Sequence, residues 1–125
     1  MRRSDQRRDA IFALYQREVT GRPLDELLAG AKPFTRELAL GADAELTEID
    51  REIARLAHGW ALERIAPLER SIMRVGLYEL RRRNDVPPEV AIDEAVSIAK
   101  RYCGAEAPGF VNGILAAAAR EGAVR

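Results

Sequence analysis

The sequence has very little cysteine, histidine or lysine, and it lacks any long apolar run. One cysteine and one histidine in 125 residues make an intrachain disulfide impossible and leave almost no soft metal ligands. We therefore expect no metal, no cofactor and a reducing, cytoplasmic setting. No apolar run exceeds six residues, whereas roughly 20 are needed to span a bilayer. The N-terminus is rich in arginine rather than apolar residues, so the sequence predicts neither a signal peptide nor a membrane span.

Of the 20 basic residues, 18 are arginines and two are lysines. Arginine makes bidentate contacts to phosphate and stacks on bases, although codon bias in a GC-rich genome explains the same composition equally well. The net charge is zero, which by itself argues against a nucleic-acid binder. The charges are unevenly placed, however: the net charge is +3 in residues 1–22, −4 in 23–66 and +1 in 67–102. The chain is neutral but polarised.

Hydrophobic residues recur with a helical period nearly throughout, and no stretch shows the sustained alternation of a strand. The sequence predicts an all-α fold, a compact bundle of about six to seven helices. Capping residues, glycines and prolines place the expected helices at about 4–19, 24–29, from Pro33 to about 56, 67–83, 88–103, and after Pro108 and Gly109.

Two of these helices carry patterns that predict their packing. In the stretch after Pro33, the residues Leu38 to Leu56 form one continuous apolar stripe, and Gly41 within it indicates a close helix crossing. That stretch is expected to end at His58, Gly59 and Trp60, with the tryptophan as an aromatic plug.

The helix at 67–83 has an apolar arc of roughly 200°, which is typical of a central helix. On the same helix Arg70, Arg74 and Arg81 lie within roughly 40° of one another. They are expected to form a basic stripe that the core cannot use.

Nothing in the sequence supports catalysis. His58 is the only candidate base of its type, and its place after a helix C-terminus is explained by capping or by the helix dipole. Cys103 occupies an apolar stripe, so we interpret it as a structural thiol. The common Gly-rich phosphate loops and metal-ligand spacings are absent. We predict no catalytic residue and a protein that is not an enzyme.

Arginines crowd the first turns of the first helix, at Arg2, Arg3, Arg7 and Arg8. Positive charge at a helix N-terminus opposes the helix dipole and costs stability. An anionic partner would offset this cost, whereas a frayed, solvated arm explains the cluster equally well.

Four segments resemble the NusB family of bacterial transcription antitermination factors. They read RRDAIFALYQ (7–16), APLERSIMRVGLYEL (66–80), DVPPEVAIDEAVSIAKRY (85–102) and PGFVNGIL (108–115). The resemblance covers nearly the whole chain. It implies a single domain, 1–125, made of two three-helix sub-bundles, approximately 1–66 and 67–125, packed roughly perpendicular to each other.

The resemblance also implies a function. Members of the family bind boxA RNA of ribosomal RNA leader transcripts as a heterodimer with NusE, a small-subunit ribosomal protein. Together with other Nus factors on the RNA polymerase elongation complex, they prevent premature termination. Carried over by position, the RNA-binding residues are Arg3, Arg7, Glu106 and Phe110, to which we add Arg2 and Arg8 on grounds of charge. The expected NusE-binding residues are Tyr15, Glu63, Glu69 and Arg70.

Elementary chemistry agrees with this assignment, because an exposed Phe110 can stack an unpaired base. Core packing beside Val111 and Ile114 is the alternative role for this ring. The loop that begins at Glu106 lacks the lysine common in the family, so we expect weak RNA binding by the isolated chain and a large contribution from NusE.

Two other functions stay open. One is an accessory RNA-binding domain like those fused to RNA cytosine methyltransferases, and the other is a helical protein-interaction module without RNA binding. The resemblance also leaves monomer and homodimer as alternatives.

Overall fold

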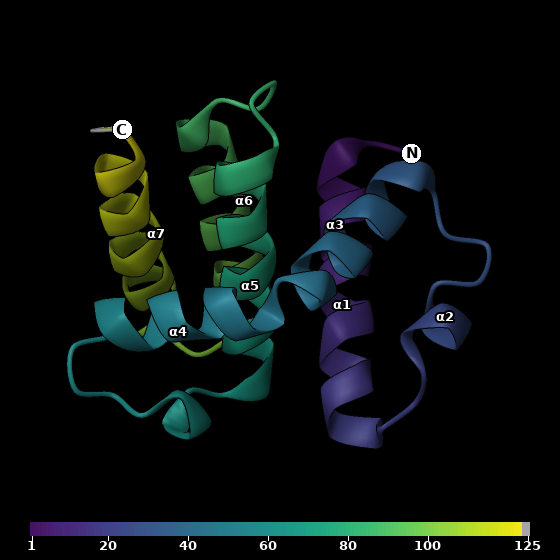
Figure 1. Cartoon of the computed structure of the whole chain (residues 1–125), viewed down its shortest axis with the longest axis horizontal. Helices are drawn as coiled ribbons and strands as arrows, with labels where there is room; N and C mark the ends of the chain where they lie inside the picture. Colours follow the sequence, from purple (N-terminus) through teal and green to yellow (C-terminus); the bar gives the residue numbers. More distant parts are fainter. Residues whose placement is uncertain (124–125) are drawn as a thin grey trace.

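The computed structural model describes residues 1–123, which form seven α-helices, one short 3₁₀ helix and no strand (Figure 1). The all-α prediction is confirmed. The elements are α1 (Arg3–Thr20), α2 (Leu24–Leu27), α3 (Pro33–Ala44), α4 (Leu46–Leu56), η1 (Leu62–Arg64), α5 (Pro67–Arg82), α6 (Pro88–Tyr102) and α7 (Ala107–Ala123). Proline opens α3, α5 and α6, since its fixed φ suits the first helical turn and its missing N–H costs nothing there.

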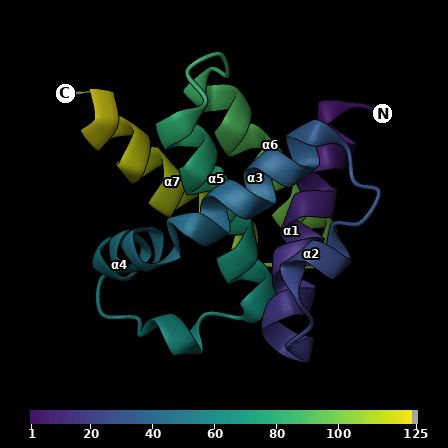
Figure 2. The same cartoon turned by 45° about the vertical axis from the view of Figure 1, so that its right-hand side comes forward.

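Helix α5 is the central element, as its wide apolar arc predicts. Every residue from Ser71 to Glu79 is buried, and α1, α3, α4, α6 and α7 all pack against this helix. Figure 2 shows α5 with α1 on one side and α7 on the other, and α3 crossing in front of it. Helix α1 is therefore held in place by its contacts with both α3 and α5.

The expected single stripe from Leu38 to Leu56 is divided between two helices, which corrects the sequence interpretation. The chain bends at Glu45, where φ is −107° and ψ is 20°. Helix α3 packs on α1 and α5, whereas α4 packs on α5 and α7 and lies across them (Figure 1). One straight helix cannot reach both sets of partners. The division into sub-bundles of approximately 1–66 and 67–125 stays a prediction.

Gly41 lies at a close helix crossing, as the sequence indicates. A methyl group added at this position would overlap the ring of Tyr78 on α5. Trp60 was expected to close the end of the stretch after Pro33 as an aromatic plug, but it is 57% exposed and does not fill the core. His58 and Gly59, with φ of 46° and 87°, turn the chain after α4 and carry the tryptophan outward.

The accessible surface is 6894 Å², close to the roughly 6,700 Å² that surface scaling gives for a folded domain of this mass. No helix within residues 1–123 is long and apolar enough to cross a membrane.

Candidate RNA and partner interface

Arg7 is buried, contrary to its expected place on an RNA-binding surface. Only 4% of the residue is exposed. Its Nε donates to both carboxylate oxygens of Glu79 at 2.9 Å, and Nη2 donates to Oε2 at 2.6 Å. Nη1 donates to Glu94 Oε1 at 3.3 Å, and Ser4 Oγ donates to the same oxygen at 2.6 Å. Arg7 thus ties α1 to α5 and α6, and its guanidinium is occupied by carboxylates.

The other three arginines of the N-terminal cluster are more accessible. The side chains of Arg2 and Arg3 are 84% and 49% exposed and lie 3.7 and 3.5 Å from Asp5 and Asp85. The guanidinium of Arg3 also lies 4.4 Å from the centroid of Phe34, within the range of a cation–π contact. Weak, exposed ion pairs of this kind cost little to exchange for phosphate.

Arg8 is partly buried, and it pairs with Asp5 at 3.4 Å and Asp9 at 3.2 Å. The hydrogen bond to Asp9 raises the pKa of Arg8, and Tyr102 at the end of α6 contributes in the same direction. Tyr102 also packs edge-to-face on Phe12, with 5.0 Å between ring centroids. These contacts join the start of α1 to the end of α6.

The arginine stripe of α5 serves the core, which corrects the second expectation about this helix. Arg74 is 7% exposed. Its Nε and Nη2 donate to Asp50 on α4 at 2.8 and 2.9 Å, and its Nη1 donates to Glu18 on α1 at 3.1 Å. Arg81 pairs with Glu52 on α4. The stripe fixes α4 and α1 to the central helix.

Arg70 belongs to the same stripe and was expected to contact NusE. Its Nη2 donates to Glu18 at 2.8 Å, and its Nη1 donates to the carbonyl of Leu62 at 3.0 Å. Burial acts to raise the pKa of Glu18, but the hydrogen bonds from Arg70 and Arg74 lower it. Arg70 therefore holds η1 and α1 against α5, with little of its side chain free for a partner.

Phe110 lines a cavity of about 180 Å³ between η1, the start of α5 and the start of α7. Its ring packs at 62° to that of Trp60, with 6.4 Å between centroids. The cavity is also lined by Arg64, Glu69 and Glu106. The structure thus brings together Glu106 and Phe110, expected to bind RNA, and Glu69, expected to bind NusE.

The remaining predicted partner residues, Tyr15 and Glu63, lie on α1 and η1 and are partly buried and exposed, respectively. Cys103 ends α6. Burial raises the pKa of its thiol, and the negative charge of Glu69 raises it further. The end of α6 is therefore close enough to Glu69, which lines the cavity of Phe110, for its charge to act on the thiol.

Sequence reasoning missed two exposed groups near the predicted RNA-binding residues. Arg101 lies over the ring of Tyr102, with 5.6 Å between its Cζ and the ring centroid, and Trp60 stands beside Phe110. Arg101 and Tyr102 end the segment 85–102 that carries the family resemblance, and this position could have indicated Arg101 as a candidate. Nothing in the sequence indicated that Trp60 lies beside Phe110 of α7, because this contact follows only from the fold.

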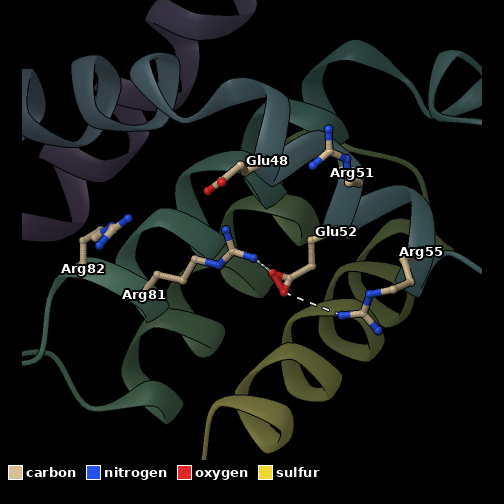
Figure 3. Close-up of a pocket in the computed structure, with 6 residues that line it drawn as sticks. All are labelled: Glu48, Arg51, Glu52, Arg55, Arg81 and Arg82. Carbon is tan, nitrogen blue, oxygen red and sulfur yellow. Dashed lines mark ion pairs between the residues drawn. The ribbon is translucent and has the colours of Figure 1, made fainter. Parts of the chain in front are cut away.

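A larger groove of about 480 Å³ between α4 and α5 lies elsewhere. Figure 3 shows the side chain of Glu52 between those of Arg81 and Arg55, with an ion pair to each. Arg82 at its rim pairs with Glu45 at 2.8 Å. None of the sequence-predicted site residues lines this groove. No cluster of His, Cys, Asp or Glu within the described part of the chain is arranged to hold a metal ion.

Comparison with known proteins gives consistent results over almost the whole chain. A Rubrobacter xylanophilus protein named transcription antitermination protein NusB is 40% identical over 122 residues, which cover 92% of this chain and 88% of that protein. The structure of T. maritima NusB superposes with a TM-score of 0.91 at 35% identity and covers 97% of this chain and 92% of that one.

A third match is a chain from a crystal structure of antitermination factors NusB and NusE in complex with double-stranded RNA. Its TM-score is 0.85 at 25% identity, with 95% of this chain and 96% of that chain covered. The family model described as the NusB family matches residues 4–120. With its helical order, its central α5 and these similarities, the chain belongs to the NusB family.

Proposed function

We propose that this chain is a non-catalytic RNA-binding factor that binds boxA RNA together with NusE and helps RNA polymerase to avoid premature termination. The observation that carries the proposal is the similarity, over 95% of the chain, to a chain from the complex of NusB and NusE with RNA. The N-terminal arginines and the aromatic cavity are two features of this chain that suit RNA.

The proposed RNA surface runs from Arg2, Arg3 and Arg8 on α1, past the end of α6, to Glu106 and Phe110. The arginines neutralise phosphates, and Phe110 stacks an unpaired base. Arg7 does not belong to this surface, because Glu79 and Glu94 already occupy its guanidinium.

The proposed NusE surface comprises Tyr15, Glu63 and Glu69. Carboxylates suit a ribosomal protein, whose basic side chains otherwise face RNA. Arg70 supports this surface indirectly, since it holds the backbone of η1 at Leu62. Through NusE and further Nus factors, the RNA-bound protein would join the elongation complex in the cytoplasm.

Titration of a labelled boxA RNA, with and without NusE, tests the proposal. We expect weak binding by the chain alone and much tighter binding by the mixture. Arg3→Ala should weaken binding and reduce the salt slope by roughly one counterion. Arg22→Ala is the matched control, since Arg22 is an exposed arginine beyond the other end of α1, 3.5 Å from Glu26. Failure of the mixture to bind RNA would refute the proposal.

The partner surface has its own test. Glu63→Lys reverses an exposed charge outside the aromatic cavity and should reduce co-purification with NusE while the helix content stays unchanged. The homodimer remains a prediction, which the mass in solution with and without RNA decides.

A further inference from the structure

The groove between α4 and α5 carries more positive than negative charge. Its volume is about 480 Å³, and its lining residues are Glu48, Arg51, Glu52, Arg55, Arg81 and Arg82 (Figure 3). Arg51 and Arg55 are four residues apart on α4 and therefore share one face of that helix. Arg81 and Arg82 come from the end of α5. Four positive charges thus stand against two negative ones, in a chain whose net charge is zero.

Three of these guanidinium groups are available to a ligand. Arg51 is exposed, and no residue among 1–123 forms an ion pair or a hydrogen bond with its side chain. Arg55 pairs with Glu121 at 2.6 Å and Arg82 pairs with Glu45 at 2.8 Å, and the two arginine side chains are 54% and 56% exposed. Exposed pairs contribute little to stability. An anionic ligand can therefore replace these partners at small cost.

An apolar cavity of about 460 Å³ continues this groove toward α7. The ion pair of Arg81 with Glu52 lines both cavities, so they meet at this pair. Beyond the pair most of the lining is apolar and comes from α5, the start of α6 and the end of α7: Leu77, Leu80, Pro88, Ala118 and Ala119. Leu80 and Ala119 are only partly buried. The surface thus offers guanidinium groups and an apolar hollow side by side.

The chemistry of this combined surface favours a protein segment over RNA. Glu48 and Glu52 stand among the arginines on the same face of α4, so the regularly spaced phosphates of a strand would meet carboxylates as well. Among the described residues that line the two cavities, none is Phe, Tyr or Trp, the rings on which bases stack. A peptide can place carboxylates against the arginines and an aliphatic side chain in the apolar cavity.

We propose that this surface docks an acidic, partly apolar segment of a protein partner other than NusE. Carboxylates of the segment pair with Arg51, Arg55 and Arg82, and an aliphatic side chain enters the cavity beside Leu80 and Ala119. None of the residues predicted to bind RNA or NusE lines either cavity, so all three partners can bind together. The inference goes beyond the proposed function, since it gives the chain a third binding surface, formed by α4, α5 and α7.

A dye-labelled peptide in which pairs of glutamates alternate with leucines is the probe. Its fluorescence anisotropy is measured with the full chain, alone and in complex with NusE and boxA RNA. We expect equal affinity in both states, weaker binding when serine replaces each leucine, and no binding when lysine replaces each glutamate. Affinity should fall as salt rises, because exposed charges are screened. Changes in amide chemical shifts at Arg51, Arg55, Arg82 and Ala119 should locate the peptide.

Substitutions test the two halves of the surface separately. Arg51→Ala should weaken peptide binding roughly 1.5- to 5-fold, the range for one exposed ion pair, and Arg51→Glu should weaken it further. Arg22→Glu is the matched control, because Arg22 lies outside both cavities, and it should bind like the wild type. Ala119→Gln should weaken binding of the leucine peptide but not of the serine peptide. Glutamine is a good helix former, and Arg51 has no partner to lose, so these variants should unfold at the wild-type temperature.

The possible failures are distinct. Absence of peptide binding, or equal effects of Arg51→Glu and Arg22→Glu, would overturn the docking surface. Displacement of the peptide by NusE, or by an oligouridine whose own binding Arg51→Glu weakens, would assign the surface to that ligand instead. Self-association of the wild type that Arg51→Glu abolishes would make a second copy the occupant, and this too would overturn the proposal. All these outcomes leave the binding of boxA RNA with NusE, and thus the proposed function, unaffected.

Discussion

Removal of Arg7 should destabilise the protein severely, because it leaves the carboxylate of Glu79 buried without a partner. The two side chains are 5% and 1% exposed and share three hydrogen bonds. Breaking a buried pair by removing one member costs about 3–5 kcal/mol. This is a large part of the roughly 5–15 kcal/mol of a typical domain, and it corresponds to a fall of roughly 10–25 °C in Tm.

Urea and thermal unfolding followed by far-ultraviolet circular dichroism measure the effect. Arg7→Ala should show the full loss. The double variant Arg7→Met with Glu79→Leu should recover most of it, since replacing a buried pair by apolar side chains is often neutral. Arg22→Ala is the control, because it breaks an exposed pair with Glu26 and should cost less than about 1 kcal/mol.

RNA binding by the same variants separates the two roles of the N-terminal arginines. The folded double variant should bind RNA nearly as well as the wild type, while Arg3→Ala should not. If Arg7→Ala loses less than about 1 kcal/mol of stability and instead lowers the salt slope of RNA binding, Arg7 is an RNA contact and the reasoning is refuted.

Three further outcomes are expected. Gly41→Ala should lower the free energy of unfolding by about 1–3 kcal/mol, because the added methyl group overlaps Tyr78. Gly113→Ala, with open space around it in α7, should raise the free energy of unfolding by up to about 1 kcal/mol. Equal effects of the two substitutions in denaturant titrations would contradict this difference. Hydrogen bonds from two arginines of α5 lower the pKa of Glu18 in the folded protein, against the effect of burial. Ionised Glu18 therefore stabilises the fold at pH values above its ordinary pKa of about 4.3. This stabilisation is lost as the pH falls through the lower pKa of the folded protein. Unfolding midpoints measured between neutral and acidic pH should therefore fall less for Glu18→Gln than for the wild type. Burial, chiefly, raises the pKa of the Cys103 thiol, so the midpoint of its alkylation rate against pH should lie above that of a small free thiol measured alongside; a lower midpoint would show an activated thiolate.

The helices and the central role of α5 could be predicted because they follow from local patterns. A wide apolar arc on one segment requires packing on several sides, and it predicted the burial of the apolar residues between Ser71 and Glu79. Gly41 was informative for the same reason, since a glycine inside an apolar stripe indicates a close approach.

The bend at Glu45 and the burial of Arg7 and Arg74 could not be predicted in this way. The apolar stripe continues through Glu45, and only the separate positions of α1 and α7 require two helices. Arg7 and its partner Glu79 are 72 residues apart in sequence, so helical spacing indicated the face of the arginine but not what it meets. The charge counts predicted surface arginines, whereas Arg7 and Arg74 are buried because each pairs with carboxylates of other helices.

Hydrogen exchange on the chain, alone and in complex with NusE and boxA RNA, tests the central claim most directly. The account predicts slower exchange at the start of α1 and from the end of α6 through the first turn of α7, with an unchanged rate in the groove lined by Arg51, Arg55 and Arg82. Protection of that groove, with no change at the start of α1 or around Phe110, would contradict it.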